Sequence, residues 1–205
     1  MLRSLSLAAL LGGLILSASA QAVDVDPATY GYPITNPFEA TIATTPPQMR
    51  PYLPSEDDIR QSDYSLTLRP EREFTLPANF WAVKKLTYRM ARQDHPAPLM
   101  FLIAGTGAPY NSSLNEYLKK LFYQAGYHVV QLSSPTSYDF MSAASRFATP
   151  GISQYDAEDL YHVMQAVRAQ QADVPVTDYY LSGYSLGALD AAFVSHLDET
   201  RKSFN

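Results

Sequence analysis

The sequence predicts an α/β domain, with an open and mostly parallel β-sheet that carries helices on both faces. Three segments, at 99–104, 127–132 and 178–182, are predicted to be strands that are buried on both faces, and the first of them is a continuous apolar run. Each segment is followed, directly or after a loop, by a stretch with helical periodicity, and this alternation favours a parallel sheet. Of the 205 residues, 46% are hydrophobic and 17% are charged, which is enough for a core and argues against a disordered chain.

Residues 1–20 are expected to form a cleaved signal peptide. Arg3 supplies a positive start, an apolar run extends from Leu5 to Leu16, and Ala18-Ser19-Ala20 offers the small residues that a signal peptidase needs. The apolar run of about twelve residues is too short to span a bilayer, which takes about 20. We therefore expect export to a periplasm or to the medium, with no membrane-spanning segment in the mature chain.

Residues 21–61 are predicted to form an extended, proline-rich arm that precedes the domain at 62–205. Pairs such as Pro46-Pro47 favour polyproline-like backbone. Four aromatic residues lie along this arm: Tyr30, Tyr32, Phe38 and Tyr52. They are expected to pin the arm onto the domain surface, and the alternatives are a proline-rich ligand for a partner protein or plain disorder.

The first half of the domain is predicted to hold four strands and one helix. Alternating side chains predict strands at 64–68 and 83–90. The helix is expected from Ser113, whose capping box with Glu116 opens it, to Ala125. Its buried face is predicted to be the apolar stripe Leu114, Tyr117, Leu118, Leu121 and Phe122.

The second half is predicted to continue with a loop at 133–152 and helices at 153–171 and 185–199. The first of these helices has an apolar stripe made of Leu160, Val163, Met164 and Val167. The loop contains Tyr138, Phe140 and Met141, which either anchor it to the domain or line an acyl pocket.

A G-x-S-x-G motif, Gly183-Tyr184-Ser185-Leu186-Gly187, joins the last predicted strand to the last predicted helix. This motif places a serine on a strained turn, where a side chain at either glycine would collide with the neighbouring strand or helix. Chance produces roughly 0.07 such matches in a chain of this length. The apolar strand before the motif and the small residues after it make this match more specific, and we expect Ser185 to be a nucleophile.

Together with this motif, residues 62–200 resemble the α/β-hydrolase superfamily, and Phe101–Gly107 resembles secreted bacterial hydrolases. The resemblance implies that Ser185 attacks an acyl carbonyl, and that the N–H groups of Leu186 and of Thr106 or Gly107 form the oxyanion hole. The His-Gly pair common in that loop is replaced by Ala104-Gly105, which leaves the choice between Thr106 and Gly107 open. An ordinary strand-to-helix connection is the alternative interpretation of this loop.

No histidine is expected to complete a catalytic triad with Ser185. The superfamily order is Ser, Asp or Glu, then His, and His196 is the one histidine after Ser185. Eleven positions along a helix place it about 16 Å away. His95 and His128 are expected at the opposite edge of the sheet, and His162 on a helix surface.

Two explanations follow for the missing histidine. In the first, which we favour, the chain is the N-terminal portion of a longer exported hydrolase of a small-molecule or lipid acyl substrate, inactive by itself. A sheet that stops after strand 178–182 leaves an apolar strand as an open edge, which supports this explanation. In the second, the chain is a non-catalytic exported binding or scaffold protein with the same fold.

Composition and spacing disfavour other classes of site. The net charge of −5 supplies no basic stripe for nucleic acid. The absence of cysteine excludes disulfides, thiolate nucleophiles and iron–sulfur clusters, and fits a bacterial periplasm. No ligand-spaced cluster predicts a metal, and no cofactor is expected. The acidic residues at 56–58, Asp156 and Asp159 are predicted to be solvated, and Asp190 to be a packing or surface acid.

Overall fold

The computed structural model describes residues 31, 33–43, 50–69, 84–146 and 150–204. The chain divides into two units, Met1–Pro51 and Tyr52–Asn205, which we describe separately. The predicted signal peptide, part of the predicted arm, and the arm's Tyr30 and Tyr32 lie outside the described residues. Among the residues that are described, the structure contains no helix with the length and apolar character needed to cross a bilayer.

The first unit contains a short helix where the sequence predicted extended chain. Helix α1 (Pro37–Ile42) is capped by Asn36, whose side chain accepts hydrogen bonds from the N–H groups of Phe38 and Glu39 at 2.9 and 3.2 Å. A proline at the first helical position and an asparagine cap both favour a helix start, which explains the difference. In the second unit, Tyr52 is 84% exposed, so it does not pin the arm.

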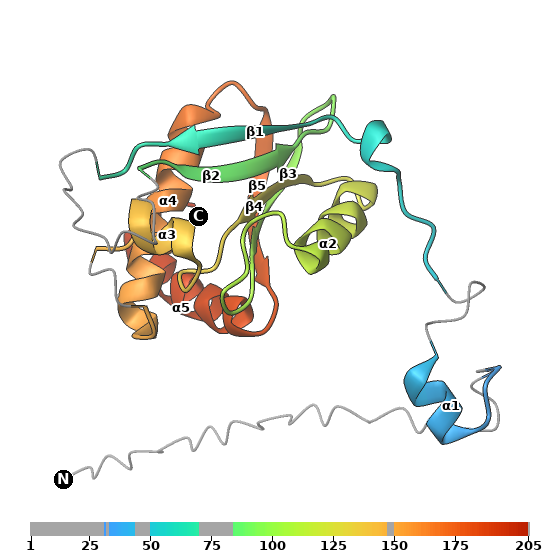
Figure 1. Ribbon diagram of the computed structural model, residues 1–205. Coiled ribbons are helices and arrows are strands. Elements are labelled where there is room, and N and C mark those ends of the chain that lie inside the picture. The colour runs from blue at the N-terminus through green and yellow to red at the C-terminus, as the bar shows by residue number, and fades with distance from the viewer. Residues whose placement is uncertain (1–30, 32, 44–49, 70–83, 147–149, 205) are drawn as a thin grey trace, which may run out of the picture. The chain divides into compact units, whose positions relative to one another are not determined.

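The second unit is built on a five-stranded sheet with the order β1-β2-β4-β3-β5 (Figure 1). The strands are β1 (Gln61–Leu66), β2 (Leu86–Ala91), β3 (Ala97–Ile103), β4 (His128–Leu132) and β5 (Val176–Gly183). Strands β3, β4 and β5 are parallel, and β2 is antiparallel to both of its neighbours. Four strands therefore run in one direction, and the predicted α/β class with a mostly parallel open sheet is confirmed.

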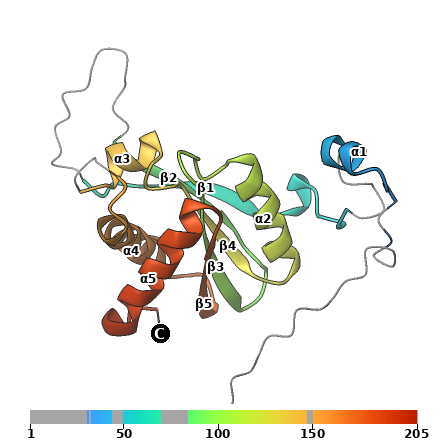
Figure 2. The same cartoon turned by 90° about the horizontal axis from the view of Figure 1, so that it is seen from below.

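Helices cover both faces of the sheet, as predicted (Figure 2). Helix α2 (Ser113–Gln124) lies on one face; α3 (Tyr138–Ala143), α4 (Ser153–Gln170) and α5 (Leu186–Arg201) lie on the other. Alternate residues of each strand supply the two cores, because successive side chains in a strand point to opposite faces. In β3, for example, Phe101 packs toward α4 and Leu102 toward α2.

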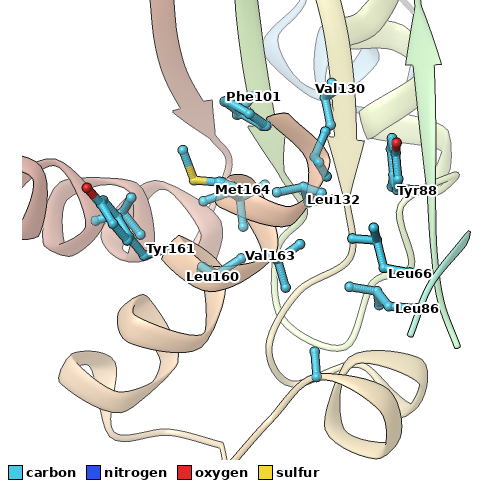
Figure 3. Close-up of a cluster of buried hydrophobic side chains, with 14 of the residues drawn as sticks. Leu66, Leu86, Tyr88, Phe101, Val130, Leu132, Leu160, Tyr161, Val163 and Met164 are labelled. Carbon is cyan, nitrogen blue, oxygen red and sulfur yellow. The ribbon is translucent and has the colours of Figure 1, made fainter. Parts of the chain in front are cut away.

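The larger core is the one between the sheet and α4, and some of its members are drawn in Figure 3. The predicted stripe of α4 is confirmed, since Leu160, Val163, Met164 and Val167 are all at most 3% exposed. The predicted loop at 133–152 contains helix α3, because Phe140 is fully buried in this core and ties the segment down. Anchoring of the loop, rather than an acyl pocket, is thus the interpretation that Phe140 supports.

Helix α2 differs from its prediction in both cap and face. Its N-cap is Ser112 and its side chain makes no capping hydrogen bond, so the capping box predicted for Ser113 is wrong. Leu114 and Tyr117 of the predicted stripe are 44% and 41% exposed, whereas Lys119 is fully buried. The reason is a set of charged partners that the helix meets on its inner side.

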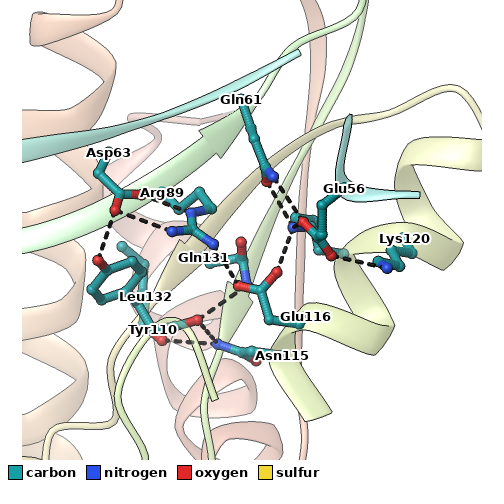
Figure 4. Close-up of polar contacts among 11 residues, drawn as sticks. Glu56, Gln61, Asp63, Arg89, Tyr110, Asn115, Glu116, Lys120, Gln131 and Leu132 are labelled. Atoms are coloured by element: carbon teal, nitrogen blue, oxygen red, sulfur yellow. Dashed lines mark hydrogen bonds and ion pairs between the residues drawn. The ribbon is translucent and has the colours of Figure 1, made fainter. Parts of the chain in front are cut away.

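These partners form a polar network between α2 and the start of the second unit (Figure 4). The Lys119 ammonium donates to Glu56 and Gln61, each at 2.7 Å, and also to Glu116. Arg89 of β2 donates to Glu116 at 3.0 Å. Partial burial of Glu56 raises its pKa, but the hydrogen bonds from Lys119, Gln61 and a second lysine outweigh this effect and lower the pKa to about 2. A cation buried among carboxylates is acceptable because it is paired.

Strand β5 is the edge of the sheet in the part of the chain that the structure describes, where it pairs with β3 alone. The sequence predicted a strand buried on both faces, but Tyr180 is 47% exposed. The open edge expected after this strand is therefore observed. Strand β1 is shifted from the predicted 64–68 to Gln61–Leu66, and β2 from 83–90 to Leu86–Ala91.

Candidate active site

Ser185 lies at the junction between β5 and α5, in a strained backbone conformation. Its φ of 54° and ψ of −125° fall in a region that non-glycine residues rarely adopt. The turn is closed by a hydrogen bond of 3.0 Å from the Gly187 N–H to the Tyr184 carbonyl. The Ser185 side chain is exposed at the carboxyl end of the parallel strands.

Both glycines of the motif are required by close backbone approach. A Cβ atom at Gly183 would lie 2.4 Å from the carbonyl carbon and oxygen of Gly187, in the following helix. A Cβ atom at Gly187 would lie 2.4 Å from the carbonyl oxygen of Ile103, in the neighbouring strand β3. The collisions expected from the sequence therefore occur, one with the helix and one with the strand.

The backbone N–H of Leu186, at the start of α5, is next to this serine in the chain. Leu186 is the first residue of α5, a helix of 16 residues. The first N–H groups of a helix have no partner within it, and they carry the positive end of the helix dipole. The N–H of Leu186 directly follows Ser185, where negative charge on a substrate oxygen would be stabilised.

The loop after β3 lies beside the turn that carries Ser185. Ile103 of β3 is in register with Gly183 of β5, so residues 104–107 leave the sheet beside the motif. The ring of Tyr184 lies over Gly105, where a Cβ atom would come within 2.6 Å of Tyr184 Cε2. The Tyr184 hydroxyl also contacts the Ser112 hydroxyl at 3.0 Å, next to α2. Tyr184, which our sequence reasoning gave no role, therefore connects the two loops.

The two candidate amides of this loop differ in their partners. The N–H of Gly107 donates to the hydroxyl oxygen of Thr136 at 2.7 Å. The N–H of Thr106 has no hydrogen-bond partner among the described residues, and Thr106 is exposed. Thr136 was not predicted to lie here, and its separation of 29 positions from Gly107 explains why no local pattern shows it.

Two histidines lie at the far edge of the sheet, as expected. His128 begins β4 and is in register with Leu99, near the start of β3, whereas Ser185 follows the ends of the parallel strands. His128 is buried, accepts a hydrogen bond of 3.0 Å from the Gln93 N–H, and has its pKa lowered by that burial. His95 precedes β3 and lies at the same edge.

The other two histidines are on helix surfaces. His162 is exposed midway along α4. His196 is exposed on α5 and contacts Glu199 at 3.1 Å. Because a helix rises about 1.5 Å per residue, His196 is about 16 Å from Ser185 along the helix axis. The structure therefore brings none of the four histidines to the serine.

A buried carboxyl lies one turn beyond the motif. Asp190 on α5 is fully buried, and neither of its oxygens has a hydrogen-bond partner among the described residues. Burial, together with the nearby charge of Asp156, raises the pKa of Asp190 to about 7. Of the two roles expected for Asp190, a packing acid or a surface acid, its burial favours the packing acid.

Asp156 and Asp159 of α4 were predicted to be solvated, and this prediction is wrong. They are 4% and 3% exposed because nearby donors bind them. Asp156 accepts the N–H of Gly151 at 2.8 Å. Asp159 accepts both the backbone N–H and the guanidinium of Arg146, at 2.8 and 2.9 Å. In the described ranges no group of three or more Asp, Glu or His side chains is arranged to hold a metal.

Solved structures similar to this chain were found, at low sequence identity. Brefeldin A esterase, a bacterial homologue of human hormone-sensitive lipase, is 16% identical with a TM-score of 0.53, over 82% of this chain and 42% of that one. Dienelactone hydrolase from Anabaena variabilis is 15% identical with a TM-score of 0.50, over 70% of this chain and 60% of that one. This chain thus spans about half the length of these structures. No protein-family model and no curated protein matches the sequence.

Proposed function

The chain has the α/β-hydrolase fold, and from that premise we propose that it carries the nucleophile of a serine hydrolase. This hydrolase cleaves an ester or a related acyl bond of a small-molecule or lipid substrate. The observation that carries the proposal is the backbone of Ser185, strained at φ 54° and directly before the N-terminus of α5. Strain of this kind persists where function requires it.

The chemistry follows from the groups around Ser185. Its Oγ attacks the acyl carbonyl carbon while its proton passes to a general base. The carbonyl oxygen becomes an oxyanion, which the N–H of Leu186 and an N–H of Thr106 or Gly107 stabilise. The base returns the proton to the departing alkoxide, and an acyl-enzyme on Ser185 remains. Water then attacks the acyl carbon and releases the acid.

We propose that the general base comes from outside these 205 residues. His95 and His128 lie at the far edge of the sheet, and the other two histidines are on helix surfaces away from Ser185. We propose the same origin for the acid that orients a histidine base. The 205 residues alone are therefore expected to be inactive, and the active form to be the whole protein, exported through the signal peptide predicted at 1–20.

A second function is favoured by one observation, the lack of a histidine at the edge where Ser185 lies. An exported binding or scaffold protein would keep the fold and the strained turn without turnover. In that case the exposed aromatic side chains, such as Tyr52, are available for contacts.

Ester hydrolysis by the protein purified from its natural host tests the proposal. We expect turnover of a short p-nitrophenyl ester that Ser185→Ala abolishes. Ser195→Ala, which changes an exposed serine on the same helix, is the matched control and should leave the rate unchanged. Turnover that survives Ser185→Ala would refute the nucleophile, and a folded host protein with no turnover would favour the binding protein.

A further inference from the structure

We infer that Thr136 is a positioning residue of the oxyanion hole, which engages the Gly107 amide and leaves the Thr106 amide to bind the oxyanion. This inference rests on the proposed function and deepens it. It assigns a role to a residue in the loop after β4, remote in sequence from both Ser185 and the loop after β3.

The first step is that the Gly107 amide is already occupied. Its N–H donates to Thr136 Oγ1 at 2.7 Å, a short distance for a hydrogen bond from an amide to a hydroxyl. An N–H that points at a hydroxyl of the protein does not point at a substrate oxygen. Of the two candidates in this loop, Thr106 is the one whose N–H lacks a partner among the described residues.

The second step is that Thr136 is itself held in place. Its hydroxyl contacts the Ser134 hydroxyl at 2.8 Å, and its backbone N–H donates to the same Ser134 oxygen at 3.2 Å. With Oγ1 accepting from Gly107, the Thr136 hydroxyl proton is free to be donated to Ser134. Two contacts to the Ser134 hydroxyl therefore hold Thr136, the acceptor for the Gly107 amide, in place.

The third step is that the two loops are joined at further points. The N–H of Ser134 donates to the Ala108 carbonyl at 3.0 Å. The N–H of Tyr110 donates to the Ser133 hydroxyl at 2.9 Å. Such contacts are possible because β3 and β4 are parallel neighbours, with Ile103 in register with Leu132, so their loops leave the same edge. Residues 133–136 thus brace the loop at 105–110.

The fourth step concerns the geometry that this brace imposes on Thr106. The Ala108 N–H donates to the Gly105 carbonyl at 3.0 Å, which closes a β-turn with Thr106 and Gly107 at its centre. Gly107 has a φ of +68° and Thr106 does not have a positive φ, the combination of a type II turn. The N–H of the first central residue is not used within such a turn. On its other side the loop meets the Tyr184 ring at Gly105, so the Thr106 amide is fixed between two supports.

Substitutions at Thr106 test which amide binds the oxyanion. Proline is favoured at this position of a type II turn, so Thr106→Pro removes the N–H and keeps the turn. We expect it to lower kcat of the host protein by roughly 10²–10³-fold, the loss typical of one oxyanion donor. Thr106→Ala also loses the threonine side chain but keeps the N–H, so it is the reference variant against which the kcat of Thr106→Pro is compared. Equal rates for both variants would overturn the assignment.

Substitutions at Thr136 test the positioning role without altering the Thr106 backbone. Thr136→Val has the same shape but cannot accept a hydrogen bond, so kcat should fall about tenfold at unchanged KM, the value of one hydrogen bond. Thr136→Ser keeps the hydroxyl and should restore the rate. Hydrogen exchange of the Gly107 amide should quicken in Thr136→Val and not in Thr136→Ser.

The outcomes separate this inference from the proposed function. A normal kcat in Thr136→Val, or a Gly107 amide that exchanges freely in the unmodified protein, would overturn the role of Thr136 and leave Ser185 as the nucleophile. Absence of any Ser185-dependent turnover would instead overturn the proposed function, and this inference with it.

Discussion

Replacing Asp190 with asparagine should change how the stability of the protein depends on pH. Asp190 is fully buried on α5 and its carboxyl has no hydrogen-bond partner among the described residues. Its pKa is raised from 3.8 to about 7 by burial and by the charge of Asp156. Between about pH 4 and pH 7, Asp190 therefore holds a proton in the native state that the unfolded chain has already lost.

The size of the effect follows from the difference between the two pKa values. A difference of about 3 pH units corresponds to ~4 kcal/mol, since each unit is 1.36 kcal/mol. The native state binds the extra proton, so this part of the unfolding free energy is present below the unfolded pKa. It is lost as the pH rises from about 4 to about 7. Asparagine is neutral at every pH and removes this dependence.

Urea unfolding, followed by far-UV circular dichroism at a series of pH values, measures the effect. The unfolding free energy of Asp190→Asn minus that of the unmodified protein should increase by up to ~4 kcal/mol between about pH 4 and pH 8. Asp178→Asn, which changes an exposed carboxylate near the start of β5, is the control and should run parallel to the unmodified protein. A parallel profile for Asp190→Asn as well would refute the argument that this carboxyl is buried without a partner.

Three further predictions concern the motif, the polar network and the chain alone. Gly187→Ala should lower the unfolding free energy measured in urea by about 3 kcal/mol, because the new Cβ atom meets the Ile103 carbonyl oxygen. Ser195→Ala on the same helix is the control and should not lower it. An unchanged urea midpoint of unfolding for Gly187→Ala would contradict the close approach of the two backbones. Lys119→Met should lower the unfolding free energy by about 3 kcal/mol, because Glu116 and Glu56 lose their buried cation. It should also weaken the loss of stability below about pH 4.5 that arises because Glu56 is ionised in the native state. An unaltered dependence of stability on pH in this acid range would count against this prediction. The 205 residues produced alone should show no esterase turnover, and a robust rate that Ser185→Ala abolishes would show that a base lies within them.

Sequence patterns predicted the features that depend on local spacing. The apolar stripe of α4 repeats every three to four residues, and such a pattern leaves little choice about which face is buried. The geometry of the motif at 183–187 could likewise be predicted locally, because each of its two glycines lies where another backbone segment comes too close for a side chain. The direction of the parallel strands was enough to predict that Ser185 and His128 lie at opposite ends of those strands.

Contacts between distant segments could not be predicted in this way. Lys119 is buried because Glu56 lies beside it, 63 positions earlier in the chain, and periodicity alone marks a lysine as exposed. Thr136 reaches the Gly107 amide across 29 positions. Asp156 and Asp159 are buried by donors from the segment before α4. In each case the partner comes from outside the helix or loop that carries the polar group, so the periodicity of that segment does not show it.

Labelling with a fluorophosphonate tests the central claim, that Ser185 is the nucleophile, most directly. The protein from its natural host would be labelled, digested with trypsin and sequenced by fragment-ion mass spectrometry. The expected peptide, Ala169–Arg201, also contains Ser182 and Ser195, which serve as internal controls. We predict a label on Ser185 alone and none in Ser185→Ala. A label on another serine, or a folded protein that takes no label, would contradict the account.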